Sequence, residues 1–120
     1  MLAASGYRPN CLFVCRGATA NIVGPRVLAL LGAAPLRQIN LPGPLTLPKD
    51  KGGSLLLNDV AALRLDQQIA LYDWLSTKGR GVQVLSVTAA PIEERVSRGE
   101  FLEGLYYRLN VVRVDVAPES

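Results

Sequence analysis

The sequence contains no histidine, only two cysteines and no long apolar run. Without histidine, the chain lacks the commonest general base of enzymes and the commonest ligand of catalytic metals. No stretch approaches the roughly 18 continuous apolar residues of a membrane-spanning helix. The first residues, "MLAASGYRPN", also lack the basic segment and apolar core of a signal peptide. These absences predict a cytoplasmic protein with no metal site and no membrane partner.

The two cysteines, Cys11 and Cys15, flank the apolar stretch "LFV". On a strand, their α-carbons would lie roughly 13 Å apart, which is too far for a disulfide. Two cysteines without further ligands do not complete a zinc site either. We therefore expect both to be reduced residues of the core or of a loop.

The chain also lacks a concentration of charge of one sign. Its net charge is +3, but the 13 lysines and arginines are scattered singly along the sequence. Nucleic-acid binding would favour a basic stripe, so we expect no nucleic-acid partner. The length of 120 residues and the 49% hydrophobic content predict one folded domain over residues 1–120.

Short apolar runs alternate with longer amphipathic segments. This alternation predicts an α/β fold with a parallel sheet, in which ligands bind at the carboxyl ends of the strands. The strands are expected near Cys11–Val14, Leu36–Asn40, Leu55–Asn58, Val82–Val87 and Val111–Val116. The segment "LPGPLTLPKDKGG", with three prolines and three glycines, is expected to be a loop and the only candidate hinge.

The boundaries of two helices follow from local signals. Pro25, after Gly24, is typical of a first helical turn, and Gly32 is typical of a helix end. Asp66 is the expected N-cap of a second helix that closes at Gly79. Its buried positions are expected to be Ile69, Leu71, Tyr72 and Leu75.

The stretch "GEFLEGLYYRLNVV" resembles the "G-x-F-R-x-D-L-Y-Y-R-L-N-V" segment of bacterial sigma-54-dependent transcription activators, a branch of the AAA+ ATPases. Upstream, "GGSLLLNDVAALRLDQQIALYDWL" resembles the Walker B strand and following helix of that family. "VQVLSVTAAPIEERVSRG" resembles its sensor strand, and "CLFVCRGATAN" can be laid on its first strand and phosphate loop without gaps.

The resemblance implies a three-layer P-loop NTPase/AAA+-like parallel sheet of about five strands, in the order 5-1-4-3-2, with helices on both faces. The family's helical lid would follow the last strand, and we expect no lid here because the sequence stops at Ser120. The family's insertion with a G-A-F-T-G-A loop touches sigma-54 and lies between the second and third strands. Only "LPGPLTLPKDK" stands there, so no direct sigma-54 contact is expected.

The phosphate loop implied by the resemblance is degenerate. In that register Gly17 is the only glycine that remains in the loop, and Thr19 aligns with the family's threonine. Asn21 aligns with the lysine that reaches the β- and γ-phosphates in the family. Ile22 stands where a hydroxyl would help to hold Mg²⁺. Pro25 would also remove an amide donor from the following helix. We therefore expect no bound cofactor.

The other catalytic positions are altered as well. The first Walker B acid aligns with Asn58 and the second with Asp59, while the sensor asparagine aligns with Ala89. Of the two arginines that the family offers across a subunit interface, the first aligns with Leu102 and the second with Arg108. One arginine in trans cannot replace the missing groups.

These changes predict that the chain is not an enzyme. We expect a catalytically inactive AAA+-like regulatory or protein-interaction module linked to bacterial transcription control. Its expected partner is an AAA+ activator or another copy of itself, contacted through the surface that includes Arg108. Two alternatives stay open, a nucleotide-binding sensor without hydrolysis and a working ATPase that uses ATP and Mg²⁺.

Several of these residues also have purely structural interpretations. We expect Leu105 and Leu109 to face the sheet with one of Tyr106 and Tyr107 beside them. Gln68 is expected to face solvent, and the Asp59 side chain could cap a turn at the end of its strand.

Overall fold

Five strands and their connecting helices are seen in a computed structural model, which describes residues 8–16, 20–77 and 81–116. The strands are β1 (Cys11–Cys15), β2 (Leu36–Asn40), β3 (Ser54–Asn58), β4 (Gln83–Thr88) and β5 (Val112–Val116). The helices are α2 (Ala20–Leu31), the short 3-10 helix η2 (Val60–Ala62), α3 (Leu65–Thr77), α4 (Glu93–Ser97) and α5 (Glu103–Leu109). All five expected strands are confirmed to within one residue at each end.

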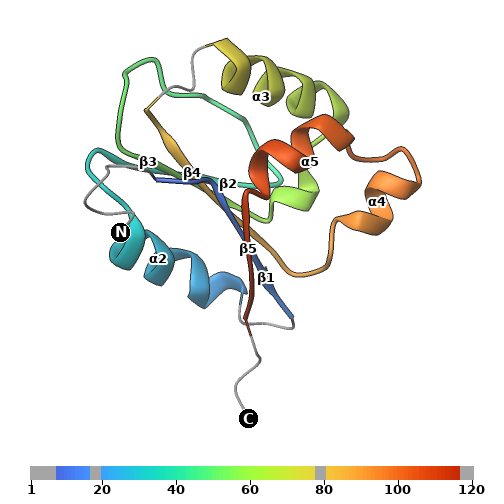
Figure 1. The fold of residues 1–120 in the computed structure, drawn as a ribbon, viewed down its shortest axis with the longest axis horizontal. Helices are drawn as coiled ribbons and strands as arrows, with labels where there is room; N and C mark the ends of the chain where they lie inside the picture. Colours follow the sequence, from blue (N-terminus) through green and yellow to red (C-terminus); the bar gives the residue numbers. More distant parts are fainter. Residues whose placement is uncertain (1–7, 17–19, 78–80, 117–120) are drawn as a thin grey trace.

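The strands form one parallel sheet in the order β2-β3-β4-β1-β5 (Figure 1). This is the predicted order, written from the opposite edge. The central strands β3 and β4 are buried along nearly their whole length, as a sheet covered on both faces requires. None of the helices in the described ranges is long and apolar enough to cross a membrane.

Helices cover both faces of the sheet, as predicted. On one face, α2 packs Val27 against a cluster that includes Phe13 and Leu85. On the other face, α3 and α5 pack against a larger cluster (Figure 1). Alternate residues of β1 therefore point into two separate hydrophobic layers.

The expected start of α2 is wrong. The helix begins at Ala20, so Pro25 lies in its middle and not in its first turn. A proline there removes the hydrogen bond to the carbonyl of residue 21, four positions back, and its ring crowds that carbonyl. The apolar residues Val23, Val27 and Leu28 pack against the sheet on both sides of the proline and hold the helix in place. The predicted end is confirmed, because the Gly32 N–H donates to the Leu28 carbonyl at 2.9 Å.

The proline-rich segment 41–53 is packed against α3, which is not the arrangement of a hinge. Leu41 is buried in the larger core. The Gly43 carbonyl accepts a hydrogen bond from Gln67 Nε2 at 2.8 Å, and the Pro48 carbonyl accepts one from Trp74 Nε1 at 2.9 Å. The segment thus lies over one face of the sheet and supplies part of its cover.

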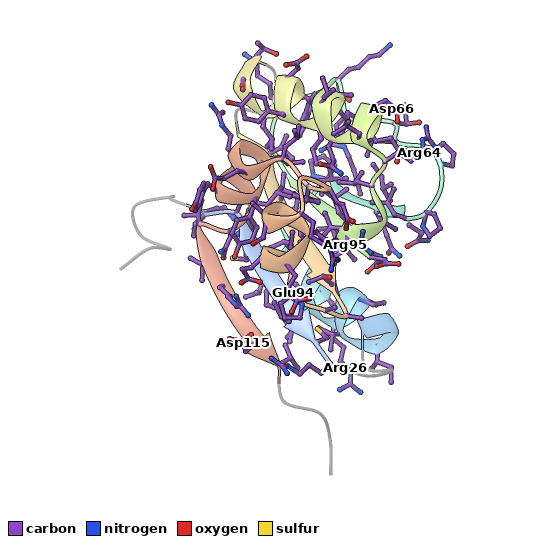
Figure 2. All side chains as sticks on the ribbon, turned by 90° about the vertical axis from the view of Figure 1, so that its right-hand side faces the viewer. Arg26, Arg64, Asp66, Glu94, Arg95 and Asp115 are labelled. Carbon is purple, nitrogen blue, oxygen red and sulfur yellow. The ribbon has the colours of Figure 1, made fainter. Side chains whose placement is uncertain are left out.

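Two expectations for α3 are also wrong. The helix begins at Leu65, so Asp66 lies in its first turn and not at the N-cap. There its carboxylate pairs with Arg64 (Figure 2), with Arg64 Nε and Asp66 Oδ1 3.1 Å apart. Ile69 is 49% exposed, whereas Gln68 and Trp74 are buried. The buried face of α3 was predicted from apolar residues alone, and this prediction failed at Ile69 because Gln68 occupies part of the buried face.

The prediction for α5 is confirmed. Leu105 and Leu109 are buried within the core that fills the α3 side of the sheet. Tyr106 is buried beside them, and Tyr107 is exposed. The four-residue spacing of the two leucines places them one turn apart on the same helix face.

Candidate functional site

The carboxyl ends of β2 and β3 hold a cluster of side-chain amides. Asn58 lies opposite Asn40 in the ladder, and its Nδ2 donates to Asn40 Oδ1 at 2.7 Å. The same oxygen accepts a second hydrogen bond from Gln38 Nε2 at 3.0 Å. The position that resembles the first Walker B acid is therefore occupied by a neutral group that bonds to its neighbouring strand.

Helix α2 closes over this cluster. A Cβ atom built on Gly24 would lie 2.3 Å from Asn58 Oδ1, so only a glycine fits here without movement. Asn58 Oδ1 itself is buried and has no hydrogen-bond partner among the described residues. The half-buried Asn58 side chain thus lies between Asn40 of β2 and Gly24 of α2.

Asp59 is the only acid of the two Walker B positions. Its backbone has the left-handed conformation, with φ of 58° and ψ of 53°, at the start of η2. The Asp59 carbonyl accepts a hydrogen bond from the Ala62 N–H at 2.9 Å, but its side chain makes no capping bond. The expected capping role is therefore played by the backbone, and the carboxylate stays exposed to solvent.

The sensor position follows β4. Ala89 is exposed and offers only a methyl group. The preceding residue, Thr88, is buried, and its hydroxyl donates to the Ala90 carbonyl at 2.8 Å. The one polar side chain at this strand end is therefore used to shape the turn.

The phosphate-loop positions are only partly described. Gly17 and Thr19 lie outside the described residues, and Asn21 is described only as part of the α2 backbone. Ile22 is 56% exposed. Cys15, which aligns with the first loop glycine, is free and fully buried, and burial raises the pKa of its thiol. Cys11 is likewise free and buried, so both cysteines are reduced core residues, as expected.

Arg108 is engaged by its own chain. Its guanidinium carbon lies 5.0 Å from the centroid of the Tyr72 ring, within the range of a cation–π contact. Tyr72 also borders Gly104, where a Cβ atom would lie 3.1 Å from the ring. The arginine is exposed, so it remains accessible to a partner while it rests on α3.

Gln68 has a structural role, and the expectation that it faces solvent is wrong. It is 1% exposed. Its Nε2 donates to the carbonyls of Leu63 and Glu100, both at 3.1 Å, and its Oε1 accepts from the Leu102 N–H at 2.8 Å. The side chain therefore joins the start of α3 to the loop before α5.

A polar network on α4, α5 and β5 was missed by the sequence interpretation. Glu93 Oε1 accepts hydrogen bonds from the Tyr106 hydroxyl at 2.9 Å and from Arg113 Nη1. Asn110 Nδ2 donates to the same hydroxyl at 3.0 Å. A buried tyrosine hydroxyl requires a polar partner, which is the one signal that could have pointed to this network.

These contacts shift two pKa values in opposite directions. Burial would raise the pKa of the Glu93 carboxyl, but the backbone hydrogen bond, the Tyr106 hydroxyl and the Arg113 charge together lower it below its usual value. Burial, and then the neighbouring Glu93 carboxylate, raises the pKa of Tyr106. In the described ranges, no group of three or more acidic or cysteine side chains could hold a metal ion.

Comparison with known proteins places this arrangement in a family. The sigma-54 interaction domain family matches residues 23–118. The DNA-binding transcriptional regulator NtrC of Proteus hauseri is 34% identical over 79 residues, covering 56% of this chain and 16% of that protein. A putative NtrX-like response regulator of Rickettsia felis is 30% identical over 97 residues, covering 72% of this chain and 20% of that protein. The chain thus matches only about a sixth to a fifth of the length of these relatives.

Solved structures show the same fold. NtrX from Brucella abortus, in complex with ATP, superposes with a TM-score of 0.71 at 20% identity, over 91% of this chain and 31% of that one. The P-loop NTPase domain of the sigma-54 transport activator from E. coli has a TM-score of 0.60 at 17% identity, over 90% of both chains. Because the family match spans most of the sequence, the chain belongs to the sigma-54 interaction domain family, the AAA+ core of sigma-54-dependent activators.

Proposed function

We propose that this domain does not hydrolyse ATP and acts as a regulatory or protein-interaction module in bacterial transcription control. The observation that carries the proposal is the amide of Asn58, which stands at the first Walker B position and bonds to Asn40 at 2.7 Å. A carboxylate there would attract Mg²⁺, whereas the Asn58 amide carries no charge and is hydrogen-bonded to the neighbouring strand.

Phosphoryl transfer needs several charged groups at once, because its catalysis rests on positioning and electrostatic stabilisation. Asp59 is the one acid left at the Walker B positions, and it is exposed. Ala89 supplies no polar group at the sensor position, and Ile22 supplies no hydroxyl for a metal ion. An arginine from another subunit could not replace the metal and its ligands.

The proposed partner is a protein, either an AAA+ transcription activator or another copy of this chain. NtrC and the NtrX-like protein, with which this chain shares its family, are described as transcriptional and response regulators. Exposed Tyr107 and Arg108 lie next to each other on α5, and aromatic and arginine side chains are enriched where proteins bind one another. We place the domain in the cytoplasm, where transcription regulators work.

We propose no direct contact between this domain and sigma-54. The connection between β2 and β3 is the segment 41–53, which packs against α3 through Gly43 and Pro48. Between β2 and β3, the described residues therefore contain no long loop that extends away from the domain. Regulation would therefore pass through a partner protein and not through the polymerase subunit itself.

A second candidate is a sensor that binds a nucleotide without hydrolysing it. This candidate is supported by the structural similarity to NtrX of Brucella abortus, whose structure is in complex with ATP. A nucleotide can be held by backbone groups and by the base alone, so loss of catalytic side chains does not by itself abolish binding.

Isothermal titration calorimetry separates the two candidates. ATP, with and without Mg²⁺, is titrated into the domain, and NtrX of Brucella abortus serves as a positive control. We expect no binding heat from this chain, because Asn21 and Ile22 replace the cation and the metal-ligand hydroxyl, and Gly17 is the only loop glycine that the sequence keeps. Saturable heat without product formation would support the sensor and contradict the interaction module.

A further inference from the structure

Strand β5 has no second neighbouring strand among the described residues. Within residues 8–16, 20–77 and 81–116, β5 pairs with β1 alone, and it forms one border of the sheet (Figures 1 and 2). The Val112 N–H donates to the Asn10 carbonyl at 3.1 Å, which directs the backbone groups of Val112 toward β1. Because these directions alternate along a strand, the N–H and C=O groups of Arg113 and Asp115 point outward from the sheet.

The side chains of β5 divide into an apolar row and a charged row. Val112 and Val114 lie opposite Cys11 and Phe13 in the ladder, on the α2 face, and are 39% and 36% exposed. Arg113 and Asp115 lie on the other face. There Arg113 Nη2 is 3.1 Å from Asp115 Oδ1, and the Asp115 side chain is 65% exposed. At the border of the sheet, the strand "VRVDV" therefore carries an apolar row on one face and a charged row on the other.

We propose that a second copy of this chain pairs with this edge, with the two β5 strands antiparallel around a two-fold axis at Val114. In this register, Arg113 of each copy lies opposite Asp115 of the other. These are the residues whose backbone groups point outward, so each pair exchanges two N–H···O bonds in the manner of an antiparallel ladder. The two Val114 residues face each other in the close, non-hydrogen-bonded position between them.

The charges select this register over its neighbours. Outward-pointing residues must meet outward-pointing residues, so the alternatives differ by two positions. One of them places Arg113 opposite Arg113, and the other places Asp115 opposite Asp115. Like charges directly opposite each other are destabilising, whereas opposite charges stabilise a strand pair. Only the register centred on Val114 joins both oppositely charged pairs.

The apolar face agrees with the same register. Val114 meets Val114, and Val112 meets Val116, so a continuous row of valines extends from one copy to the other. Residues across an antiparallel pair are the unit of sheet stabilisation, and β-branched side chains pack well there. The contact uses the same patch on both copies and closes on itself, as a two-fold interface does. The inference is independent of the proposed loss of ATP hydrolysis.

Charge exchange tests the pairing. Sedimentation equilibrium of the whole chain, from micromolar to millimolar concentration, should show a reversible dimer. Arg113→Asp and Asp115→Arg should each weaken self-association by about tenfold or more, since each places like charges opposite one another. An equimolar mixture of the two variants should form a heterodimer, because every cross-strand pair then joins opposite charges. A monomeric wild type, or a mixture that stays monomeric while both variants are folded by circular dichroism, would overturn the proposal.

A cysteine pair tests the register and does not depend on the charged variants folding. Val114→Cys places two thiols opposite each other at the two-fold axis, at a separation that suits a disulfide. Val111→Cys is the matched control, because residue 111 is more exposed, at 52%, but its two copies would lie about 20 Å apart. Mild oxidation should cross-link the Val114→Cys variant into dimers and leave the control monomeric. Equal cross-linking of both variants, or none at position 114, would contradict the register.

Discussion

At the scale of single residues, the neutral side-chain amides of Gln68 and Asn58 both form hydrogen bonds that join separate elements of the fold. Each stands in a stretch that resembles catalytic sequence of the family, yet each is held by other parts of the same chain. The residue types could be read from the sequence. Their hydrogen-bond partners could not, because Asn40 and Glu100 lie 18 and 32 positions away, on elements that meet only after folding.

Replacing Gln68 with leucine should destabilise the domain. The change leaves the carbonyls of Leu63 and Glu100 and the N–H of Leu102 without their partner. Each buried group that loses its hydrogen bond costs about 1–3 kcal/mol, so for three groups we expect a loss of about 3 kcal/mol or more in the free energy of unfolding. Urea denaturation measures it.

The matched control for Gln68 is Ile69→Ala, one position further along α3. Ile69 is half exposed, so this variant should change the free energy of unfolding by no more than about 0.5 kcal/mol. A Gln68→Leu variant as stable as this control would show that the three hydrogen bonds contribute little.

At the scale of elements, the short helix α5 has one face that packs in the core and another that is exposed to solvent. Leu105 is fully buried, whereas Arg108 is exposed and rests on the Tyr72 ring. The spacing of Leu105 and Leu109 was sufficient to predict which face of the helix packs. The Arg108–Tyr72 contact could not be predicted, because it joins two helices whose relative placement depends on the whole fold.

Leu105→Ala and Arg108→Ala should differ sharply in stability. Truncation of the buried leucine leaves a cavity and should cost roughly 2–5 kcal/mol. Loss of the exposed arginine should cost less than about 1 kcal/mol. Thermal unfolding of both variants makes the comparison. An Arg108→Ala variant that unfolds while Leu105→Ala remains folded would contradict the assignment of the helix faces.

The element boundaries were predictable where local signals agreed with burial. Strands such as β2 and β3 are short apolar or alternating runs between glycines, prolines and polar residues, so their positions follow from the pattern. The start of α2 was missed because the preference of Pro25 for a first turn is weaker than the packing of Val23 and Val27 on the sheet. Ile69 was misplaced because the buried stripe of α3 includes Gln68.

At the scale of the whole molecule, Glu93 links α4 to α5 and to the edge strand β5. Its carboxylate accepts from Tyr106 and from Arg113, which lie 13 and 20 positions later. The general fold and its strand order followed from the family resemblance. This network did not, since the resemblance assigns no functional role to Glu93, Tyr106 or Arg113.

The Glu93 network should make stability depend on pH on the acid side. The pKa of Glu93 is lower in the folded state, so its contribution is fully present above the ordinary glutamate value of about 4.3. The contribution is lost as the pH falls through the lower folded value. Between about pH 5 and pH 3, the Tm of the wild type should therefore fall more steeply than that of Glu93→Gln.

Glu94→Gln is the control for this pH series, because Glu94 is exposed on the same helix and takes no part in the network. Its pH profile should follow that of the wild type. Identical slopes for the wild type and Glu93→Gln would show that the carboxylate is not stabilised by folding.

The central claim is that a AAA+ fold persists here without its chemistry, and a phosphate-release assay tests it most directly. The purified chain is incubated with ATP and Mg²⁺ and compared with Asp59→Ala, which lacks the one acid left at the Walker B positions. We expect phosphate release from both proteins to equal the background rate. Mg²⁺-dependent turnover by the wild type that disappears in Asp59→Ala would contradict the account.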